Sequence, residues 1–433
     1  MFSLKVSKNR SCREVFRELR RAISKTSTDK NSDVISRTPE NYMPKLDLNY
    51  DKSDNYMKWM KQVQHNNIRA LSTIQRSLVN ANPASTLLVS KEQSRDFMAL
   101  FPDIVRELTD AGRQQELPEV MRRFARVLQY TVPSGKKNRA LLTAMAYNML
   151  EDSDKLTTEN VRLAHILGWC TEIMQAFFLV TDDIMDKSET RRGQPCWYRQ
   201  PGVGLNAFND GIMMQSGIFA ILKKYFRYHP AYVPIMELFH DVMLKTSYGQ
   251  SLDTMCLDEN GKPRLEEFTM KRYMSLVKYK TAYYSFQMPI ALAMYLANMF
   301  DEEQHRQAKT ILLEMGQFFQ IQDDFLDCFG DPSVTGKKGT DIQDGKCSWL
   351  AVVALQRATP DQRKIMEEHY GRSEPESVET IRRLYEELCL PNTYAIYEEE
   401  SYNIIKTHIQ QISKGLRHDM FFKIMEKIYK REC

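Results

Sequence analysis

Apolar side chains recur every three to five residues along much of this chain, which is the spacing of one face of an α-helix. The pattern becomes dense at about residue 90 and continues to the C-terminus. Proline and glycine separate the dense segments, for example at residues 131–135, 200–202 and 330–332. The alternation of apolar and polar residues that marks a half-buried strand is missing. The sequence therefore predicts one all-α domain over residues 91–433, built as a large helical bundle.

Composition favours helices and argues against several classes of protein. Only 17 of the 433 residues are glycine, which disfavours loop-rich β-proteins and folds that bind nucleotides with glycine-rich loops. The net charge of +4 is too small to indicate nucleic-acid binding. The longest unbroken apolar stretch is Ile290–Ala297, whereas a membrane-spanning helix needs roughly 20 residues, so no transmembrane segment is predicted. The eight cysteines are scattered without metal-ligand spacing, and we expect free thiols.

The N-terminal segment differs from the rest of the chain in charge. Residues 1–25 hold eight Lys or Arg and two Glu, which leaves the remaining chain near −2. A basic, acid-poor amphipathic segment resembles a mitochondrial transit peptide, and a basic tail or a peripheral amphipathic helix is the alternative. Residues 26–54 have the composition of a polar linker, and residues 55–80 carry a weak helical stripe. We therefore expect residues 1–90 to be a leader and linker and the protein to be mitochondrial, with a cytoplasmic location as the alternative.

Two helix-like segments end in the same pattern of carboxylates. Residues 175–186 read QAFFLVTDDIMD, and residues 316–327 read GQFFQIQDDFLD. Helical spacing places the three aspartates of each motif on one face, where they repel one another beside apolar residues. A single such motif is usually a solvated helix end, but two copies after apolar runs argue for a ligand. Mg²⁺ selects oxygen ligands and takes one or two carboxylates per ion together with water and phosphate oxygens. The motifs therefore predict several Mg²⁺ ions that bind a diphosphate.

Basic side chains flank both acidic motifs. Arginine suits multidentate phosphate contacts, and lysine acts as a point charge. The basic residues concerned are Arg191 and Arg192 after the first motif, Lys337, Lys338 and Lys346 after the second, and Lys136, Lys137, Arg139 and Lys280 elsewhere.

Together these motifs resemble the trans-isoprenyl diphosphate synthases, and among them the eukaryotic farnesyl diphosphate synthases. The resemblance runs from about residue 95 to the C-terminus. It rests on DDIMDKSETRRG (182–193), DDFLD (323–327), GKKNR (135–139), GQSLD (249–253), YKTAYYSF (279–286), GKKGTDIQDGKCSW (336–349) and KIYKR (427–431). Two departures are Ser134, where a second glycine is usual, and Asn206, where an aspartate is usual.

The resemblance implies an all-α bundle around a central catalytic cavity, a homodimer, and the condensation of dimethylallyl or geranyl diphosphate with isopentenyl diphosphate. It implies that about three Mg²⁺ ions bind with the diphosphate. The implied metal residues are Asp182, Asp183 and Asp186 on one wall, and Asp323, Asp324 and Asp327 on the other. Asp182 and Asp323 act directly, and the others support them.

The resemblance also implies two substrate sites. The allylic diphosphate is held by Arg191, Lys280 and Lys337, with Lys346 neutralising the same region. Isopentenyl diphosphate is held by Lys136, Arg139, Gln175 and Arg192, and Arg431 closes over it. Thr281 and Gln320 place oxygens near the developing carbocation, and the proton is lost without a histidine base.

Product length is expected to depend on Phe177 and Phe178. On a helix these residues lie roughly 6–7.5 Å before Asp182, in the direction that a growing prenyl chain takes. In the family, aromatic residues at these positions imply a stop at C15. A geranyl diphosphate synthase on the same scaffold is one alternative, and a non-catalytic helical regulatory subunit is another. A terpene cyclase would typically lack the second aspartate motif.

Overall fold

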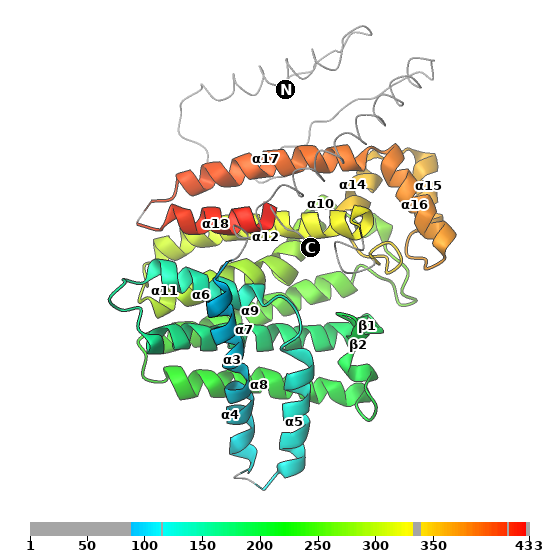
Figure 1. Ribbon diagram of the computed structural model, residues 1–433. Coiled ribbons are helices and arrows are strands. Elements are labelled where there is room, and N and C mark those ends of the chain that lie inside the picture. The colour runs from blue at the N-terminus through cyan, green and yellow to red at the C-terminus, as the bar shows by residue number, and fades with distance from the viewer. Residues whose placement is uncertain (1–87, 114–115, 332–338, 414, 430–433) are drawn as a thin grey trace. The chain divides into compact units, whose positions relative to one another are not determined.

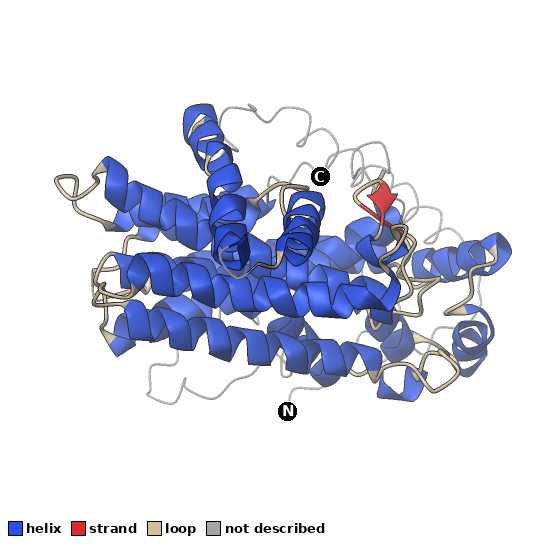
Figure 2. Ribbon diagram, turned by 90° about the horizontal axis from the view of Figure 1, so that it is seen from below, coloured by secondary structure: helices blue, strands red, loops and turns tan. Residues whose placement is uncertain are grey.

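The computed structural model describes residues 88–113, 116–331, 339–413 and 415–429 (Figure 1). Helices form almost all of this part of the chain (Figure 2). Its strands, β1 (Thr190–Arg191) and β2 (Gln194–Pro195), make one short antiparallel hairpin. The predicted all-α fold is thereby confirmed, whereas the predicted leader of residues 1–90 lies almost wholly outside the described residues.

The helices follow one another with short connections. The N-terminal half contains α3 (Lys91–Ala99), α4 (Phe101–Arg113), α5 (Pro118–Thr131), α6 (Asn138–Leu150), α7 (Thr158–Met185), α8 (Ala207–Phe226) and α9 (Tyr232–Thr254). The C-terminal half contains α10 (Met270–Val277), η6 (Lys278–Gln287), α11 (Met288–Leu296), α12 (Glu302–Phe329), α14 (Trp349–Arg357), α15 (Pro360–His369), α16 (Pro375–Glu387), α17 (Leu390–Gln410) and α18 (His418–Tyr429). The short turns of 3-10 helix are η3 (Trp197–Arg199), η4 (Gly204–Asn206) and η5 (Leu265–Glu267).

Local sequence signals explain where several helices begin. Ser90 accepts a hydrogen bond from the backbone of Gln93, and the Gln93 side chain bonds back to Ser90, which makes a complete capping box for α3. Thr157 caps α7 and Asp301 caps α12, each through its side-chain oxygen. These caps satisfy backbone donors that the first helical turn leaves unpaired.

Long helices lie side by side, while α3, α4 and α5 run across them (Figure 1). Helix α7 packs against both α6 and α8, and η6 packs against both α9 and α12. Trp169 of α7 stacks on Phe97 of α3 at 4.3 Å between ring centroids and donates its indole N–H to the Phe97 carbonyl at 3.0 Å. Both rings are fully buried, so this contact anchors the start of the described chain to the core.

Helix α7 is long and apolar enough to cross a membrane by length and composition alone. Its most apolar window is nevertheless 72% buried among the other helices of the bundle. An all-round apolar helix that is packed on most sides is a core helix.

The segment from α10 to α11 is one continuous helix whose middle, η6, is π-helical. Two glycines allow neighbouring helices to approach it closely. A Cβ at Gly249 of α9 would lie 2.1 Å from the Lys280 backbone nitrogen. A Cβ at Gly316 of α12 would lie 2.5 Å from the Cβ of Ala282. π-helical turns often occur at functional sites, and this one carries Lys280 and Thr281.

Candidate active site

The first aspartate motif lies at the C-terminal end of α7. Asp182 accepts hydrogen bonds from Gln250 at 2.9 Å, from Arg191 at 3.2 Å and from Lys280 at 3.3 Å. Asp186 accepts one from Lys346 at 2.7 Å. A helix C-terminus carries partial negative charge, so these carboxylates are unfavourable there without counter-charges. Basic side chains from three separate regions of the chain supply them.

Asp253 of α9 connects the two lysines of this cluster. Its carboxylate accepts hydrogen bonds from Lys280 at 2.6 Å and from Lys346 at 3.1 Å, and it is 7% exposed. Asp253 and Gln250 were not among the expected site residues, although both lie in the GQSLD motif. Their spacing of three residues places them on one face of α9, which is the signal that could have identified them.

These contacts determine the charge states. Burial alone would raise the pKa of Asp182, but Lys280, Arg191 and Lys346 hold that pKa below its usual value. Burial would lower the pKa of Lys280 and of Lys346, but Asp253 and neighbouring carboxylates raise both. At Asp186, burial raises the pKa more than the neighbouring Lys346 lowers it, so the pKa of this carboxyl lies above its usual value. The two lysines therefore stay positively charged at neutral pH.

The β1–β2 hairpin directs two consecutive arginines to different sites. Arg191 pairs with Gln194 across the hairpin, and both turn residues, Arg192 and Gly193, have positive φ, at 55° and 74°. This is the pattern of a two-residue type I′ turn. Arg191 makes two hydrogen bonds to Asp183, at 2.5 and 2.8 Å. Arg192 instead donates to the Ser134 carbonyl and hydroxyl.

Asp183 is buried, and its contact with Arg191 only partly offsets the rise in pKa that burial causes. Asp183 therefore positions Arg191 beside Asp182, and the supporting metal role that the resemblance implied for Asp183 stays a prediction.

The second aspartate motif, on α12, has members in different environments. Asp324 is buried and accepts hydrogen bonds from Tyr273 and from the Trp349 backbone, each at 2.7 Å, and from Gln320 at 2.9 Å. Burial raises its pKa to about 7. Asp327 accepts the Asp341 backbone N–H at 3.0 Å. Because protein donors bind both oxygens of Asp324, this side chain joins α10, α12 and α14, and its supporting metal role stays a prediction.

Thr281 and Gln320, which the resemblance placed near the reacting carbon, lie together in the structure. The Thr281 hydroxyl donates to the Gln320 side-chain oxygen at 3.0 Å, which joins η6 to α12. Asp323, one turn after Gln320 on α12, is half-buried.

A second group of the expected residues surrounds the start of α6. Arg139 donates to Ser285 at 2.7 Å and to Tyr284 at 2.8 Å, and both partners belong to η6. Gln175 lies between Arg139 and Glu172. With its amide oriented to satisfy both, its oxygen accepts a hydrogen bond from Arg139 at 2.8 Å and its nitrogen donates one to Glu172 at 3.2 Å. Arg139 and Gln175 therefore form one connected group between α6, α7 and η6.

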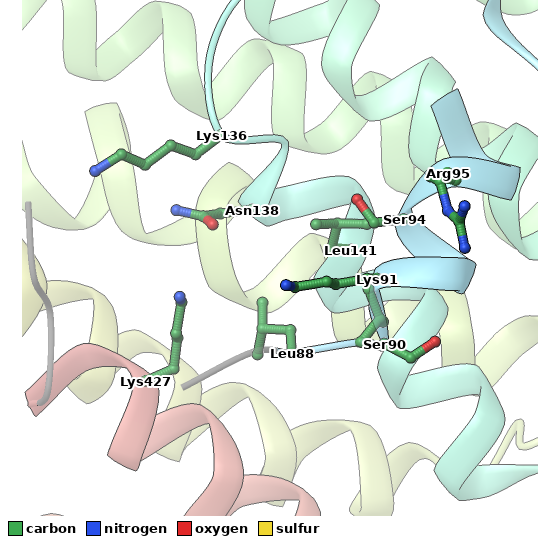
Figure 3. A pocket seen from close by; sticks show the side chains of 10 residues that line it. Leu88, Ser90, Lys91, Ser94, Arg95, Lys136, Asn138, Leu141 and Lys427 are labelled. Carbon is green, nitrogen blue, oxygen red and sulfur yellow. The ribbon is translucent and has the colours of Figure 1, made fainter. Parts of the chain in front are cut away.

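The adjacent lysines of the GKKNR motif have different surroundings. Lys137 is buried and donates to the carbonyls of Pro133, Ser134 and Gly135, and burial lowers its pKa to about 8. Lys136 is exposed and borders a pocket of about 780 Å³ (Figure 3).

Further basic residues border this pocket from α3 and α18, namely Lys91, Arg95 and Lys427. Lys136 is therefore available for an anionic ligand, whereas Lys137 stabilises the loop.

The two phenylalanines lie on α7 before the aspartates. Their rings are half-buried and 4.7 Å apart between centroids. The Phe177 ring packs over Gly211 of α8, where a Cβ would lie 3.2 Å from it. Lys337 and Arg431, to which the resemblance gave substrate roles, lie outside the described residues.

The donor groups fit a hard cation. The side chains of Asp182 and Asp186 are 17% and 23% exposed, and carboxylate oxygen is the donor that Mg²⁺ prefers. Within the part of the chain that the structure describes, no three His, Cys, Asp or Glu side chains form a group able to hold an ion. The pair of Asp182 and Asp186 therefore suits a cation that takes only one or two protein carboxylates and completes its coordination shell with phosphate and water oxygens.

Comparison with known proteins identifies the family. The profile of the polyprenyl synthetase family matches residues 121–388. The chain belongs to the polyprenyl synthetase family.

This polyprenyl synthetase is 49% identical to the farnesyl pyrophosphate synthase of Murgantia histrionica over 344 residues, 79% of this chain and 84% of the relative. It is 50% identical to the Homo sapiens enzyme of the same name, over 79% of this chain and 82% of the relative. A solved T. brucei farnesyl diphosphate synthase in complex with a bisphosphonate matches the fold with a TM-score of 0.72 and 33% identity, over 79% of this chain and all of that one. The resemblance inferred from the motifs is confirmed.

We predict that Asp253→Asn lowers turnover at least about tenfold, because the two lysine ammonium groups lose the carboxylate that holds them together and charged. Steady-state kinetics checks this, with circular dichroism to establish folding. Glu259→Gln, which removes an exposed carboxylate just beyond α9, is the matched control and should leave turnover unchanged. Equal turnover in the two variants would contradict the proposed role of Asp253.

Proposed function

We propose that this polyprenyl synthetase is a magnesium-dependent farnesyl diphosphate synthase. It condenses dimethylallyl and then geranyl diphosphate with isopentenyl diphosphate, in isoprenoid biosynthesis. The observation that carries the proposal is the arrangement at the end of α7, where Asp182 and Asp186 meet Lys280, Lys346 and Arg191. This arrangement occurs in a chain whose full-length relatives carry that name.

The first chemical requirement is stabilisation of the diphosphate as it leaves the allylic carbon. Asp182, Asp186 and, from the other wall, Asp323 would hold Mg²⁺, which when bound supplies positive charge to the leaving group. Lys280, Lys346 and Arg191 supply further fixed positive charge. Because these groups are positioned before the substrate arrives, little reorganisation accompanies charge separation.

The second requirement is orientation of the two substrates. Lys136, Arg139, Gln175 and Arg192 would hold isopentenyl diphosphate so that its double bond faces the allylic carbon. The oxygens of Thr281 and Gln320 would then lie near the developing positive charge. A new carbon–carbon bond forms, one proton leaves the product, and the departed diphosphate accepts that proton.

The two alternatives differ in what they require. A non-catalytic subunit would be expected to have lost motif residues, yet the acidic motifs and the basic positions are intact. A geranyl diphosphate synthase would use the same charged residues and differ in the depth available for the prenyl chain. Product analysis therefore separates this alternative from the proposal.

We expect the full chain, incubated with Mg²⁺ and both C5 diphosphates, to release C15 product, measured by gas chromatography after dephosphorylation. Asp182→Asn should reduce turnover at least about 100-fold, because an amide cannot supply the negative charge that binds a cation and pairs with Lys280. Asp361→Asn, at an exposed carboxylate on α15, is the control and should match wild type. Near wild-type turnover of Asp182→Asn at limiting Mg²⁺ would refute the proposed metal site.

Phe177 and Phe178 are proposed to close the end of the prenyl site. They lie on α7 five and four residues before Asp182, respectively, and adjacent helical residues point about 100° apart. The two rings together can therefore cover more of the cavity floor than either alone.

The double variant Phe177→Ala with Phe178→Ala should shift the products to C20 and longer chains, because the site becomes deeper. Each substitution should also lower the free energy of unfolding. The loss should be smaller than the ~3–5 kcal/mol typical of a fully buried Phe→Ala, because both rings are half-buried. Chromatography of a variant shown to be folded tests this. Phe219→Ala, at a half-buried ring of α8 that stacks on His240, controls for loss of an aromatic side chain. Unchanged C15 product from the double variant would exclude these rings as the length determinant.

A homodimer is proposed on the basis of the family and of apolar residues on α8 and α9. The exposed side chains of Phe208, Ile212, Leu244 and Tyr248 lie on these neighbouring helices. Light scattering of the purified protein should report twice the chain mass, and a monomeric mass would contradict the proposal.

Mitochondrial targeting by residues 1–25 is proposed from their composition. A fluorescent protein carrying this segment should co-localise with a mitochondrial marker, because basic amphipathic segments of this kind are import signals. A matched fusion in which the eight basic residues are replaced by Gln should stay diffuse. A diffuse signal from the unchanged fusion would favour the cytoplasmic alternative.

A further inference from the structure

Two buried cysteines contact each other next to the charge network of the active site. Cys256 follows the end of α9, and Cys347 directly precedes Ser348, the capping residue of α14. They are 1% and 4% exposed, and the two thiols lie close enough together that each affects the pKa of the other. The Cys256 thiol also donates to the Leu252 carbonyl at 3.2 Å. The chemistry proposed for the site uses neither thiol.

The surrounding backbone holds the two cysteines side by side. The Cys256 carbonyl accepts the Arg264 N–H at 2.9 Å, which closes the loop after α9. Pro263 of this loop packs on the turn before Cys347, where a Cβ at Gly345 would lie 2.3 Å from the Pro263 ring. The Lys346 carbonyl is held by the Tyr370 hydroxyl at 2.6 Å. Both cysteines therefore lie on short connections that pack against each other.

A third group, Arg272 of α10, faces the thiol pair. Its guanidinium lies near the Cys256 thiol and forms an ion pair with Glu267 at 2.9 Å. Its buried Nε has no hydrogen-bond partner among the described residues. The interaction with Cys347 and the nearby Arg272 outweigh burial and lower the pKa of Cys256 to about 7. A thiolate is the reactive form of cysteine, and it needs a second thiol nearby to form a disulfide.

The other cysteines provide a contrast. Burial raises the pKa of the Cys170 and Cys328 thiols and that of the partly exposed Cys389. Among the described cysteines, only Cys256 and Cys347 have thiols that affect each other's pKa.

We propose that Cys256 and Cys347 form a reversible disulfide when the protein meets a peroxide, and that this bond switches off the diphosphate site. The Cys256 thiolate attacks a peroxide oxygen and becomes a sulfenic acid as the O–O bond breaks. The Cys347 sulfur then attacks the Cys256 sulfur, and the sulfenic oxygen leaves as water with the Cys347 proton. With hydrogen peroxide, two thiols lose two electrons and two protons, and two waters form. A dithiol reductant reverses the change by exchange.

The position of the pair connects the bond to the active site. Lys346 is the neighbour of Cys347, and Asp253 lies three residues before Cys256. Lys346 contacts Asp253 at 3.1 Å and Asp186 at 2.7 Å. A disulfide needs an S–S distance of about 2.05 Å, which is shorter than contact between two thiols. Forming it pulls the two connections together and displaces Lys346 from its carboxylate partners. The loss of turnover rests on the proposed function, whereas the bond itself does not.

The test treats the reduced, full-length protein with hydrogen peroxide and divides each sample in two. One half is digested without reductant, and mass spectrometry measures a cross-linked peptide pair containing positions 256 and 347, lighter by two hydrogens than the separate peptides. The other half is assayed for turnover before and after dithiothreitol. We expect the cross-link together with at least a fivefold loss of turnover that dithiothreitol restores.

Two variants complete the experiment. Cys256→Ser should show neither the cross-link nor the reversible loss, and Cys256→Ala repeats this test if circular dichroism shows that the serine variant is misfolded. Cys389→Ser, which removes a more exposed thiol, should behave as wild type. Intact thiols at 256 and 347 while Cys389 is oxidised would overturn the proposal. So would a cross-link that leaves turnover unchanged, or equal reversible inactivation of Cys256→Ser. A reduced protein without turnover would instead refute the proposed function, and the cross-link would still be measurable by mass.

Discussion

The buried carboxylate of Asp253 holds together two lysines that would otherwise repel each other, and the active site depends on this contact. Lys280 reaches it from η6 and Lys346 from the connection before α14, and both lysines also contact the aspartates at the end of α7. Two unit charges 4 Å apart interact by about 4 kcal/mol at an effective dielectric constant of 20. Acidic and basic groups must therefore alternate for so many charges to share a partly buried site.

Local backbone geometry positions the charges of this network. The type I′ turn directs Arg191 to Asp183 and Arg192 to Ser134, so that consecutive residues serve different parts of the site. In η6 the π-helical spacing and the close approach of Gly249 bring Lys280 to Asp253. Both devices rely on glycine, because a Cβ would collide at Gly249 and is unfavourable at the positive φ of Gly193. In a chain with few glycines, these positions are among those where another side chain could not substitute.

The two aspartate motifs look equivalent in sequence but differ in environment. At the first motif, Asp182 and Asp186 keep partial exposure and basic partners. At the second, Asp324 is buried under hydrogen bonds from three other residues. Helical periodicity predicts which face an aspartate occupies, but it cannot predict which side chains arrive from other helices. Periodicity likewise cannot distinguish Lys136 from Lys137. Lys136 borders the pocket, whereas Lys137 donates hydrogen bonds to the carbonyls of its own loop.

The sequence by itself determined the all-α class, the family, and the residue types available for diphosphate chemistry. These follow from local spacing and short motifs, which need no knowledge of distant contacts. Only the tertiary structure decided that Asp253 joins two lysines, that Asp183 and Asp324 bind protein donors, and that Cys256 lies beside Cys347. The contacts of Asp253 with Lys346 and of Cys256 with Cys347 join residues far apart in the chain, and tertiary packing sets the distance between them. A charge or a thiol acquires its state from those neighbours, because burial and hydrogen bonding determine its pKa.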